Sequence, residues 1–215
     1  MRAHKLRRYV LAGIKHTVPG IIISILSFPA RAQVVSTHSF AGCAFPDTAQ
    51  AQCFNDTAEI ACPTGVNDAF YGQDAQYATT ASMPSYTIHE PVAGKQVTVD
   101  NRTGLMWAST GSNNGNAATW VDAIASCEAS SFAGFADWRL PNVRELASLV
   151  RYYEPLGAPY INQTAFPGTV SAGYRTSTTY VPSTLNAWYV DFNVGIVNLG
   201  GKTSTYYVRC VRGGP

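Results

Sequence analysis

The pattern of apolar and polar positions divides the chain into an arm and a domain. Residues 33–85 show neither the helical nor the strand period, which predicts an extended, loop-like arm. Residues 95–109 contain two short alternating runs on either side of turn residues 101–104, a pattern typical of paired strands. Beyond residue 154, short alternating runs separated by Gly, Pro, Ser and Thr predict strands and turns. We therefore expect a domain over residues 86–215.

Two segments between these regions have the period and start signals of helices. Thr119 precedes "WVDAIASCE" with Asp122 at the third helical position, and Asn142 precedes "VRELASLV" with Glu145 at the same position. The first helix directs Cys127 to the core. The second is expected to continue to Tyr153. The predicted fold class is α+β, with two short helices packed on a twisted, mainly antiparallel sheet with long loops.

The segment "AWYVDFNVGIVNL" at residues 187–199 has the strongest strand pattern. In an extended chain Trp188, Val190 and Phe192 face one side, and we expect them in the core. The alternate residues would then face outward, where they meet either water or a ligand. All four tryptophans (Trp107, Trp120, Trp138 and Trp188) are expected to be core anchors.

Residues 1–32 have the form of a signal peptide. A basic start is followed by the apolar run "IIISILSF" and by Ala30-Arg31-Ala32, so cleavage is expected before Gln33. The apolar run is too short to span a bilayer. The adjacent Arg7 and Arg8 leave a twin-arginine route open beside the general one. We expect a secreted, periplasmic or cell-surface protein with no transmembrane span in its mature chain.

Cleavage changes the charge of the protein. The whole chain has 15 basic and 13 acidic residues, but six basic residues lie in the first 32, which leaves nine against 13. The mature chain is therefore acidic, and we expect no nucleic-acid partner. Residues 139–215 alone carry seven basic and three acidic residues, so the C-terminal half is basic.

Five cysteines remain after cleavage, and export permits disulfides. Cys53 and Cys62 can close a small loop, and a bond between Cys127 and Cys210 would join the first helix to the last strand. The odd number leaves Cys43 free, bonded to another chain or lipidated, since "FAGC" resembles an acylation motif.

Five segments resemble the Lcl C-terminal domain family: "VDNRTGLMWA", "TWVDAIASC", "DWRLPNVRELASLV", "AWYVDFNVGIVN" and "YYVRCVRGG". With the upstream "CFNDTAEIACP" and "FYGQDAQY", the resemblance extends over nearly the whole mature chain. This is the domain at the end of a bacterial collagen-like adhesin, and it is related to C-type-lectin-like and formylglycine-generating-enzyme-like folds. The resemblance implies a C-type-lectin-like fold and a Cys127–Cys210 disulfide. It also implies glycosaminoglycan binding and adhesion. This chain contains no collagen-like repeat, and "YRTS" at residues 174–177 departs from the family's "YWSS".

The C-terminal strands are the predicted ligand surface, because rigid aromatics mixed with small hydrogen-bonding residues are typical of adaptable binding surfaces. The candidate ligand-binding residues are Arg175, Thr178, Tyr180, Tyr189, Asp191, Asn193, Ile196, Asn198 and Tyr207. The expected partner is a surface glycan, sulfated or not, or a protein. The alternative is a structural, envelope-associated module for protein interactions.

The residue usage of the C-terminal segment raises one further hypothesis. Trp, Met, Glu, Gln and Lys occur 23 times in the chain but only twice after residue 163. A diversity-generating retroelement mutates the adenines of Asn codons in its target gene, and such mutations cannot produce these five residues. The segment is therefore also a candidate target of a diversity-generating retroelement. Depletion of Lys, Glu and Gln in a Gly-rich β segment is the simpler explanation.

Catalytic and metal-binding patterns are weak. The mature chain has only His38 and His89, without a nucleophile or zinc motif, so we expect no enzyme. We expect no cofactor. A calcium site would need clustered carboxylates, whereas Asp100, Asp137 and Asp191 are scattered. Arg139 is expected to be structural and paired with a carboxylate such as Asp137 or Asp100.

Overall fold

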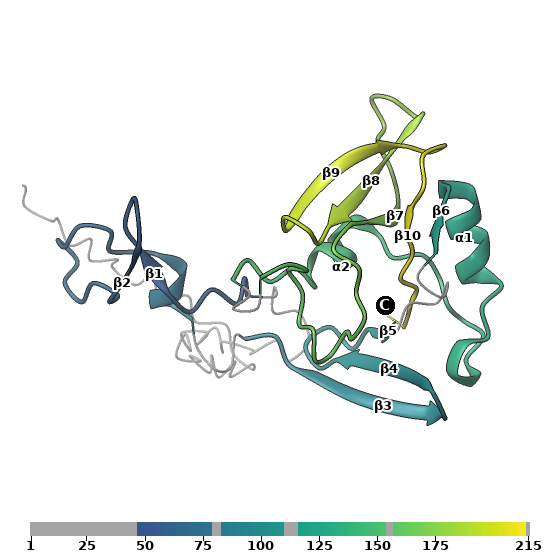
Figure 1. Cartoon of the computed structure of the whole chain (residues 1–215), viewed down its shortest axis with the longest axis horizontal. Coiled ribbons are helices and arrows are strands. Elements are labelled where there is room, and N and C mark those ends of the chain that lie inside the picture. The colour runs from purple at the N-terminus through teal and green to yellow at the C-terminus, as the bar shows by residue number, and fades with distance from the viewer. Residues whose placement is uncertain (1–46, 79–82, 110–115, 154–156, 214–215) are drawn as a thin grey trace, which may run out of the picture. The chain divides into compact units, whose positions relative to one another are not determined.

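The computed structural model describes residues 47–78, 83–109, 116–153 and 157–213 (Figure 1). The predicted signal peptide, its cleavage site and Cys43 lie outside these residues. Within the described part of the chain, no helix combines the length and the hydropathy that crossing a membrane requires.

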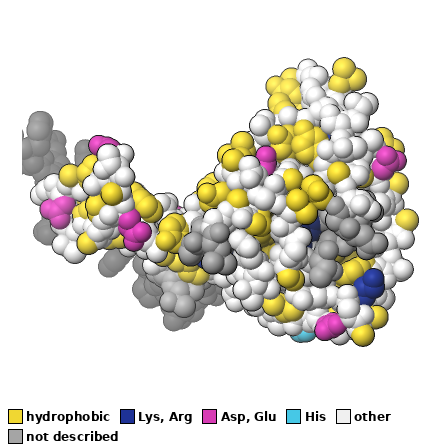
Figure 2. Space-filling model, viewed as in Figure 1, with side chains coloured by type: hydrophobic (Ala, Val, Ile, Leu, Met, Phe, Trp, Pro, Cys, Tyr) yellow, Lys and Arg dark blue, Asp and Glu magenta, His cyan; other side chains and the backbone are white. Residues whose placement is uncertain are grey.

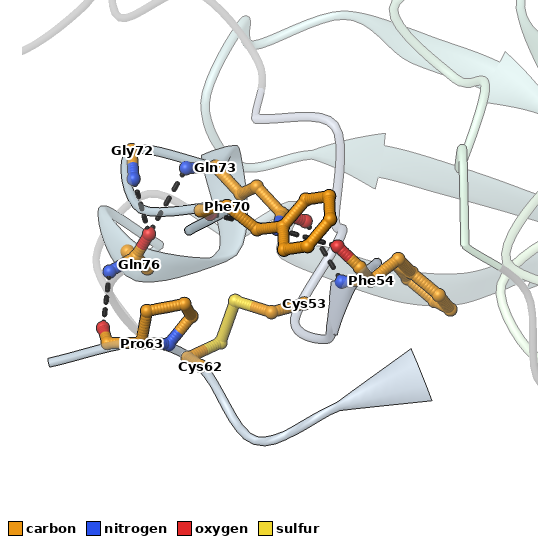
Figure 3. The surroundings of a disulfide bond; sticks show 8 residues. All are labelled: Cys53, Phe54, Cys62, Pro63, Phe70, Gly72, Gln73 and Gln76. Atoms are coloured by element: carbon orange, nitrogen blue, oxygen red, sulfur yellow. Dashed lines mark hydrogen bonds between the residues drawn. A yellow bond between two sulfur atoms is a disulfide. The ribbon is translucent and has the colours of Figure 1, made fainter. Parts of the chain in front are cut away.

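A small disulfide-closed module precedes the domain. Strands β1 (Cys53–Phe54) and β2 (Glu59–Ile60) pair as a hairpin, and the Cys53–Cys62 disulfide closes it, which confirms that pairing. The side chain of Gln73, just before the 3-10 helix η1 (Asp74–Gln76), accepts from the Phe54 N–H at 2.9 Å and donates to the Phe54 carbonyl at 2.8 Å (Figure 3). The Gln76 amide donates to the Pro63 carbonyl. The side-chain amides of Gln73 and Gln76 therefore form hydrogen bonds with backbone groups that a third strand would otherwise pair.

The domain contains two sheets rather than the single sheet expected. The first has the order β11-β5-β4-β3, all antiparallel. Its strands are β3 (Tyr86–Val92), β4 (Lys95–Asp100), β5 (Met106–Ala108) and β11 (Val211–Arg212). The predicted turn between β4 and β5 is confirmed, and the buried Asp100 carboxylate holds it by accepting from the Arg102 N–H and the Thr103 hydroxyl.

The second sheet has the order β6-β10-β7-β8-β9 and is antiparallel except for the β10–β7 pair. Its strands are β6 (Ala117–Ala118), β7 (Gly173–Thr179), β8 (Asn186–Asp191), β9 (Ile196–Gly201) and β10 (Tyr206–Tyr207). In Figure 1, β8 and β9 lie on the opposite side of the domain from β3 and β4. Only three residues separate β10 from β11, so the end of the chain passes directly from one sheet to the other.

Both helices begin where the sequence predicts. Helix α1 (Trp120–Glu128) is capped by the Thr119 hydroxyl, and α2 (Val143–Ala147) by the capping box of Asn142 and Glu145. The second helix is shorter than expected. It ends at Ser148, whose hydroxyl donates to the Glu145 carbonyl, and Val150 instead forms a β-bridge with Ile161. The domain is thus α+β as predicted.

The core has two apolar clusters. One packs α2 and the five-stranded sheet around Trp107, Phe166 and Phe192, and the other packs α1 around Trp138. The Cys127–Cys210 disulfide is confirmed and joins α1 to the segment between β10 and β11. Trp107 and Trp138 are fully buried, as expected of anchors, whereas Trp120 and Trp188 are only partly buried.

Candidate functional site

The five-stranded sheet has one face toward the core and one away from it. Tyr174 pairs with Val190 across β7 and β8, and both belong to the buried core. Arg175 and Tyr189, the next pair, therefore point to the opposite side, which we call the outer face. By the same alternation Gly173, Asp191, Ile196, Asn198 and Gly200 share the outer face.

Arg175 is on the outer face but does not contact solvent, so its prediction as an exposed ligand residue is wrong. Its side chain is fully buried and donates through Nη2 to the carbonyls of Gly201 and Ser204. These bonds hold the β9–β10 connection over the sheet. Burial lowers the pKa of Arg175, and the neighbouring Tyr206 acts in the opposite direction. In this structure the arginine ties the β9–β10 connection to the sheet.

Tyr206 is the residue that covers Arg175. The Arg175 guanidinium carbon lies 4.4 Å from the Tyr206 ring centroid. The Tyr189 and Tyr206 ring centroids are 4.3 Å apart, and the two rings are tilted by 32°. We call Arg175, Tyr189 and Tyr206 the Tyr206 cluster. Both tyrosines are partly buried. The sequence pattern offered no reason to choose Tyr206, because β10 has only two residues and its alternation cannot be read from them.

Two glycines make room for these rings. A Cβ atom on Gly173 would lie 2.7 Å from the Tyr206 ring and 2.9 Å from the Tyr189 ring, and one on Gly200 would lie 2.5 Å from the Tyr206 hydroxyl. Tyr206 thus reaches Gly200 of β9 although β7 and β8 lie between their strands in the sheet order. The five-stranded sheet is therefore strongly curled, and the Tyr206 cluster occupies the concave side.

Tyr207 faces the other way, so its prediction as an outward residue is also wrong. It lies opposite Tyr174 in the β10–β7 pair, and their ring centroids are 5.5 Å apart. Tyr207 packs against the main core cluster. Alternation along β10 directs Tyr206 outward and Tyr207 inward.

Four other predicted residues make contacts within the chain. The Thr178 hydroxyl accepts from the Val143 N–H at the start of α2, and the Tyr180 ring meets Trp188 edge-on at 5.6 Å. Asp191 accepts from the Asn193 N–H in the β8–β9 turn, and Asn193 accepts from the Ser171 hydroxyl. All four side chains remain at least partly accessible.

Ile196 and Asn198 on β9 are exposed, as expected. Asn198 lies directly opposite Tyr189, and Ile196 directly opposite Asp191. The Asn198 side-chain oxygen accepts from the Leu199 N–H, which satisfies one backbone group of this edge strand. The structure therefore brings Tyr189, Tyr206, Asp191, Ile196 and Asn198 together on the accessible part of the outer face.

The basic excess of the C-terminal half does not form a basic surface around this site. Arg209 is buried and donates to the carbonyls of Ala108 and Ser109, and burial lowers its pKa. Lys202 lies 4.0 Å above the Trp120 ring centroid. In the view of Figure 2, hydrophobic side chains gather over the region of β8 and β9, and little dark blue is visible.

Two further arginines are held by carboxylates. Arg139 forms two hydrogen bonds with Glu145, at 2.8 and 2.6 Å, so it is structural as predicted but with a different partner. Of the two partners expected for Arg139, Asp137 instead binds Arg212, and Asp100 accepts from the turn after β4. Glu145 is favoured because its capping position places the carboxylate beside both Arg139 and the Asn142 N–H.

Other candidate sites are less developed. A shallow pocket of about 310 Å³ lies between Val92, Lys95 and the 3-10 helix η2 (Phe132–Gly134). It is far from the outer face in the fold, since it borders the four-stranded sheet. Within the described residues, no group of three or more His, Cys, Asp or Glu side chains is arranged to hold a metal ion.

These features define a disulfide-stabilised α+β domain that presents a polar and aromatic sheet face. The model of the Lcl C-terminal domain matches residues 96–212, which is more than half of the chain. The chain belongs to the Lcl C-terminal domain family, as the five sequence segments predict. A comparison with curated proteins gives no match.

Proposed function

We propose that this chain is an exported, adhesin-like binding protein whose ligand surface is the accessible part of the outer face. Family membership supports a surface or adhesin-like role. The observation that carries the proposal is the grouping of Tyr189, Tyr206, Asp191, Ile196 and Asn198, in which fixed aromatic rings lie beside polar and apolar side chains. Partly rigid aromatics with small polar neighbours are efficient binding groups, because they lose little conformational entropy.

The site also argues for binding rather than catalysis. Its aromatic and amide groups lack a paired nucleophile and base, so we propose that the protein is not an enzyme. The ligand is a surface glycan or a protein.

A surface-binding assay tests this proposal. The full chain, fluorescently labelled, is applied to cell monolayers and to immobilised extracellular matrix. Ile196→Arg should reduce binding, because it places a long charged side chain on this surface, directly opposite Asp191. Ile88→Arg on β3 is the matched control, since Ile88 is 44% exposed and Ile196 is 45% exposed. Equal loss in both variants, or none in either, would contradict the assignment of this face.

The alternative, an envelope-associated module for protein contacts, is favoured by the exposed aliphatic side chains around the β8–β9 turn. Val194, Ile196 and Val197 are all exposed there. Crosslinking in intact producing cells distinguishes the two readings. A photoreactive residue at position 194 should crosslink an envelope protein if the module serves the envelope, and should not if the protein is an adhesin.

Export itself is tested by intact mass. Protein recovered from the culture medium and the cell envelope should have the mass of a chain that begins at Gln33. Comparison with and without reductant counts the disulfides, and an added mass on Cys43 would show lipidation. Recovery of only the uncleaved chain from the cytoplasm would refute export.

A further inference from the structure

We propose that the outer face binds an uncharged sugar ring, which packs against Tyr189, held in place by Tyr206, and is hydrogen-bonded by Asp191 and Asn198. This inference rests on the proposed function and names the ligand class of the same surface.

The aromatic pair is held rigidly. The two rings are 4.3 Å apart and only 32° from parallel, and the backbone of Gly173 lies directly beneath both. The buried Arg175 contacts Tyr206 at 4.4 Å and is itself held by two carbonyls. The rings are thus fixed before any ligand arrives. A sugar ring presents a flat face of C–H bonds, and such a face packs well against a fixed aromatic surface.

Polar groups on β8 and β9 lie beside the rings. Asn198 lies opposite Tyr189 on β9, and Asp191 follows Tyr189 on the same face of β8. The Asn198 oxygen is engaged by the Leu199 N–H, so its amide nitrogen is the group directed to a ligand as donor. Asp191 uses Oδ1 for the Asn193 N–H, and a carboxylate has a second oxygen that can accept. A donor and an acceptor on either side of a ring suit the hydroxyl groups of a sugar.

The charges around the tyrosine pair favour a neutral ligand over a sulfated one. Among the described residues, the cation that contacts the tyrosine pair is Arg175, which is buried and donates through Nη2 to the carbonyls of Gly201 and Ser204. Sulfate recognition needs accessible Arg or Lys groups. The carboxylate of Asp191 would instead repel a sulfate. Burial and the neighbouring Tyr206 and Asp191 raise the pKa of Tyr189 above its ordinary value. The surface therefore suits a neutral glycan better than a sulfated one.

The test is calorimetry and NMR titration of the full chain with neutral oligosaccharides (cellotetraose, chitotetraose and N-acetyllactosamine) and with heparin, at low and high salt. We expect at least one neutral sugar to bind with little dependence on salt. Tyr189→Ala should weaken that binding about tenfold, and Tyr189→Phe, which keeps the ring, should stay within about threefold. Tyr152→Ala is the matched control, because Tyr152 is 57% exposed and lies outside the outer face. Thermal unfolding of each variant confirms that it is folded.

The outcomes separate this inference from the proposed function. Binding of heparin alone, weakened by salt and unchanged in Tyr189→Ala, overturns the neutral-sugar inference and leaves the proposed function standing. Binding to cells or matrix that depends on Ile196, without any sugar binding, does the same and indicates a protein ligand. Failure of the chain to bind any surface or sugar removes both.

Discussion

The close packing of Gly173 under two tyrosine rings makes a sharp prediction for Gly173→Ala. The backbone of Gly173 has no positive φ, so alanine fits its conformation, and the cost of the change in the folded state is steric. The new Cβ would lie 2.7 Å from Tyr206 Cδ1 and 2.9 Å from Tyr189 Cδ2. Carbon atoms in good contact are about 3.5–4.0 Å apart, so both rings must move by roughly 1 Å.

The expected cost follows from this overlap. Overpacking of this kind costs about 1–3 kcal/mol, and the lower entropy of the unfolded alanine chain returns about 0.4–1 kcal/mol. Gly173→Ala should therefore lower the free energy of unfolding by about 1–2 kcal/mol. Urea denaturation measures it, and near-UV circular dichroism reports the displaced tyrosines.

Two further variants make the test specific. At Gly201 the nearest atom to a new Cβ is Ser204 Oγ at 3.4 Å, so Gly201→Ala should be close to neutral. In a Tyr206→Ala background the main obstacle is gone, and Gly173→Ala should cost clearly less than in the wild type. If Gly173→Ala is as stable as the wild type and leaves the tyrosine signal unchanged, the description of the Tyr206 cluster is wrong.

Three other predictions concern the interior. Replacing Cys127 and Cys210 with alanine should cost about 2–5 kcal/mol in urea denaturation, because the bond closes a loop with a separation of 83 residues; a cost below about 1 kcal/mol would show that it contributes little. Burial opposes ionisation of Glu145, but hydrogen bonds from Arg139 and Asn142 outweigh burial and lower the pKa of Glu145. The ionised carboxylate therefore stabilises the folded domain above the ordinary pKa of 4.5, and this contribution is lost as pH falls through the lowered pKa. Glu145→Gln should therefore flatten the loss of stability between about pH 5 and pH 3, and an unchanged pH profile would count against this pairing. Arg209→Lys should cost about 2–4 kcal/mol by thermal or urea unfolding, because one ammonium cannot serve all the oxygens that the guanidinium reaches; a fully stable variant would contradict that reasoning.

Local signals in the sequence predicted a large part of this structure. The caps at Thr119 and Asn142 begin the two helices, and the burial of Val190 and Phe192 follows from strand alternation. These features depend on residues close together in the chain, which is why sequence patterns suffice. The Cys127–Cys210 bond was implied by family resemblance rather than by any local pattern.

The outer face was predicted less well, because its composition depends on long-range geometry. Strand alternation correctly places Arg175 on the outer face, but the curl of the sheet and the β9–β10 connection bury its side chain. Tyr207 was placed on the wrong face because a strand of two residues has no readable period. Tyr206 was missed for the same reason. The glycines at positions 173 and 200 were the available signal, since small residues on a strand face can mark a close approach of large ones.

The last residues of the described domain carry an unusual share of its architecture. β10 is an interior strand of one sheet, β11 extends the other, and Cys210 between them anchors α1. A nascent polypeptide that stops short of Tyr206 has neither sheet complete, so folding must wait until nearly the whole domain has been synthesised. A premature stop codon upstream of Tyr206 should therefore leave the domain without an interior strand of one sheet, without β11 and without the Cys127–Cys210 disulfide.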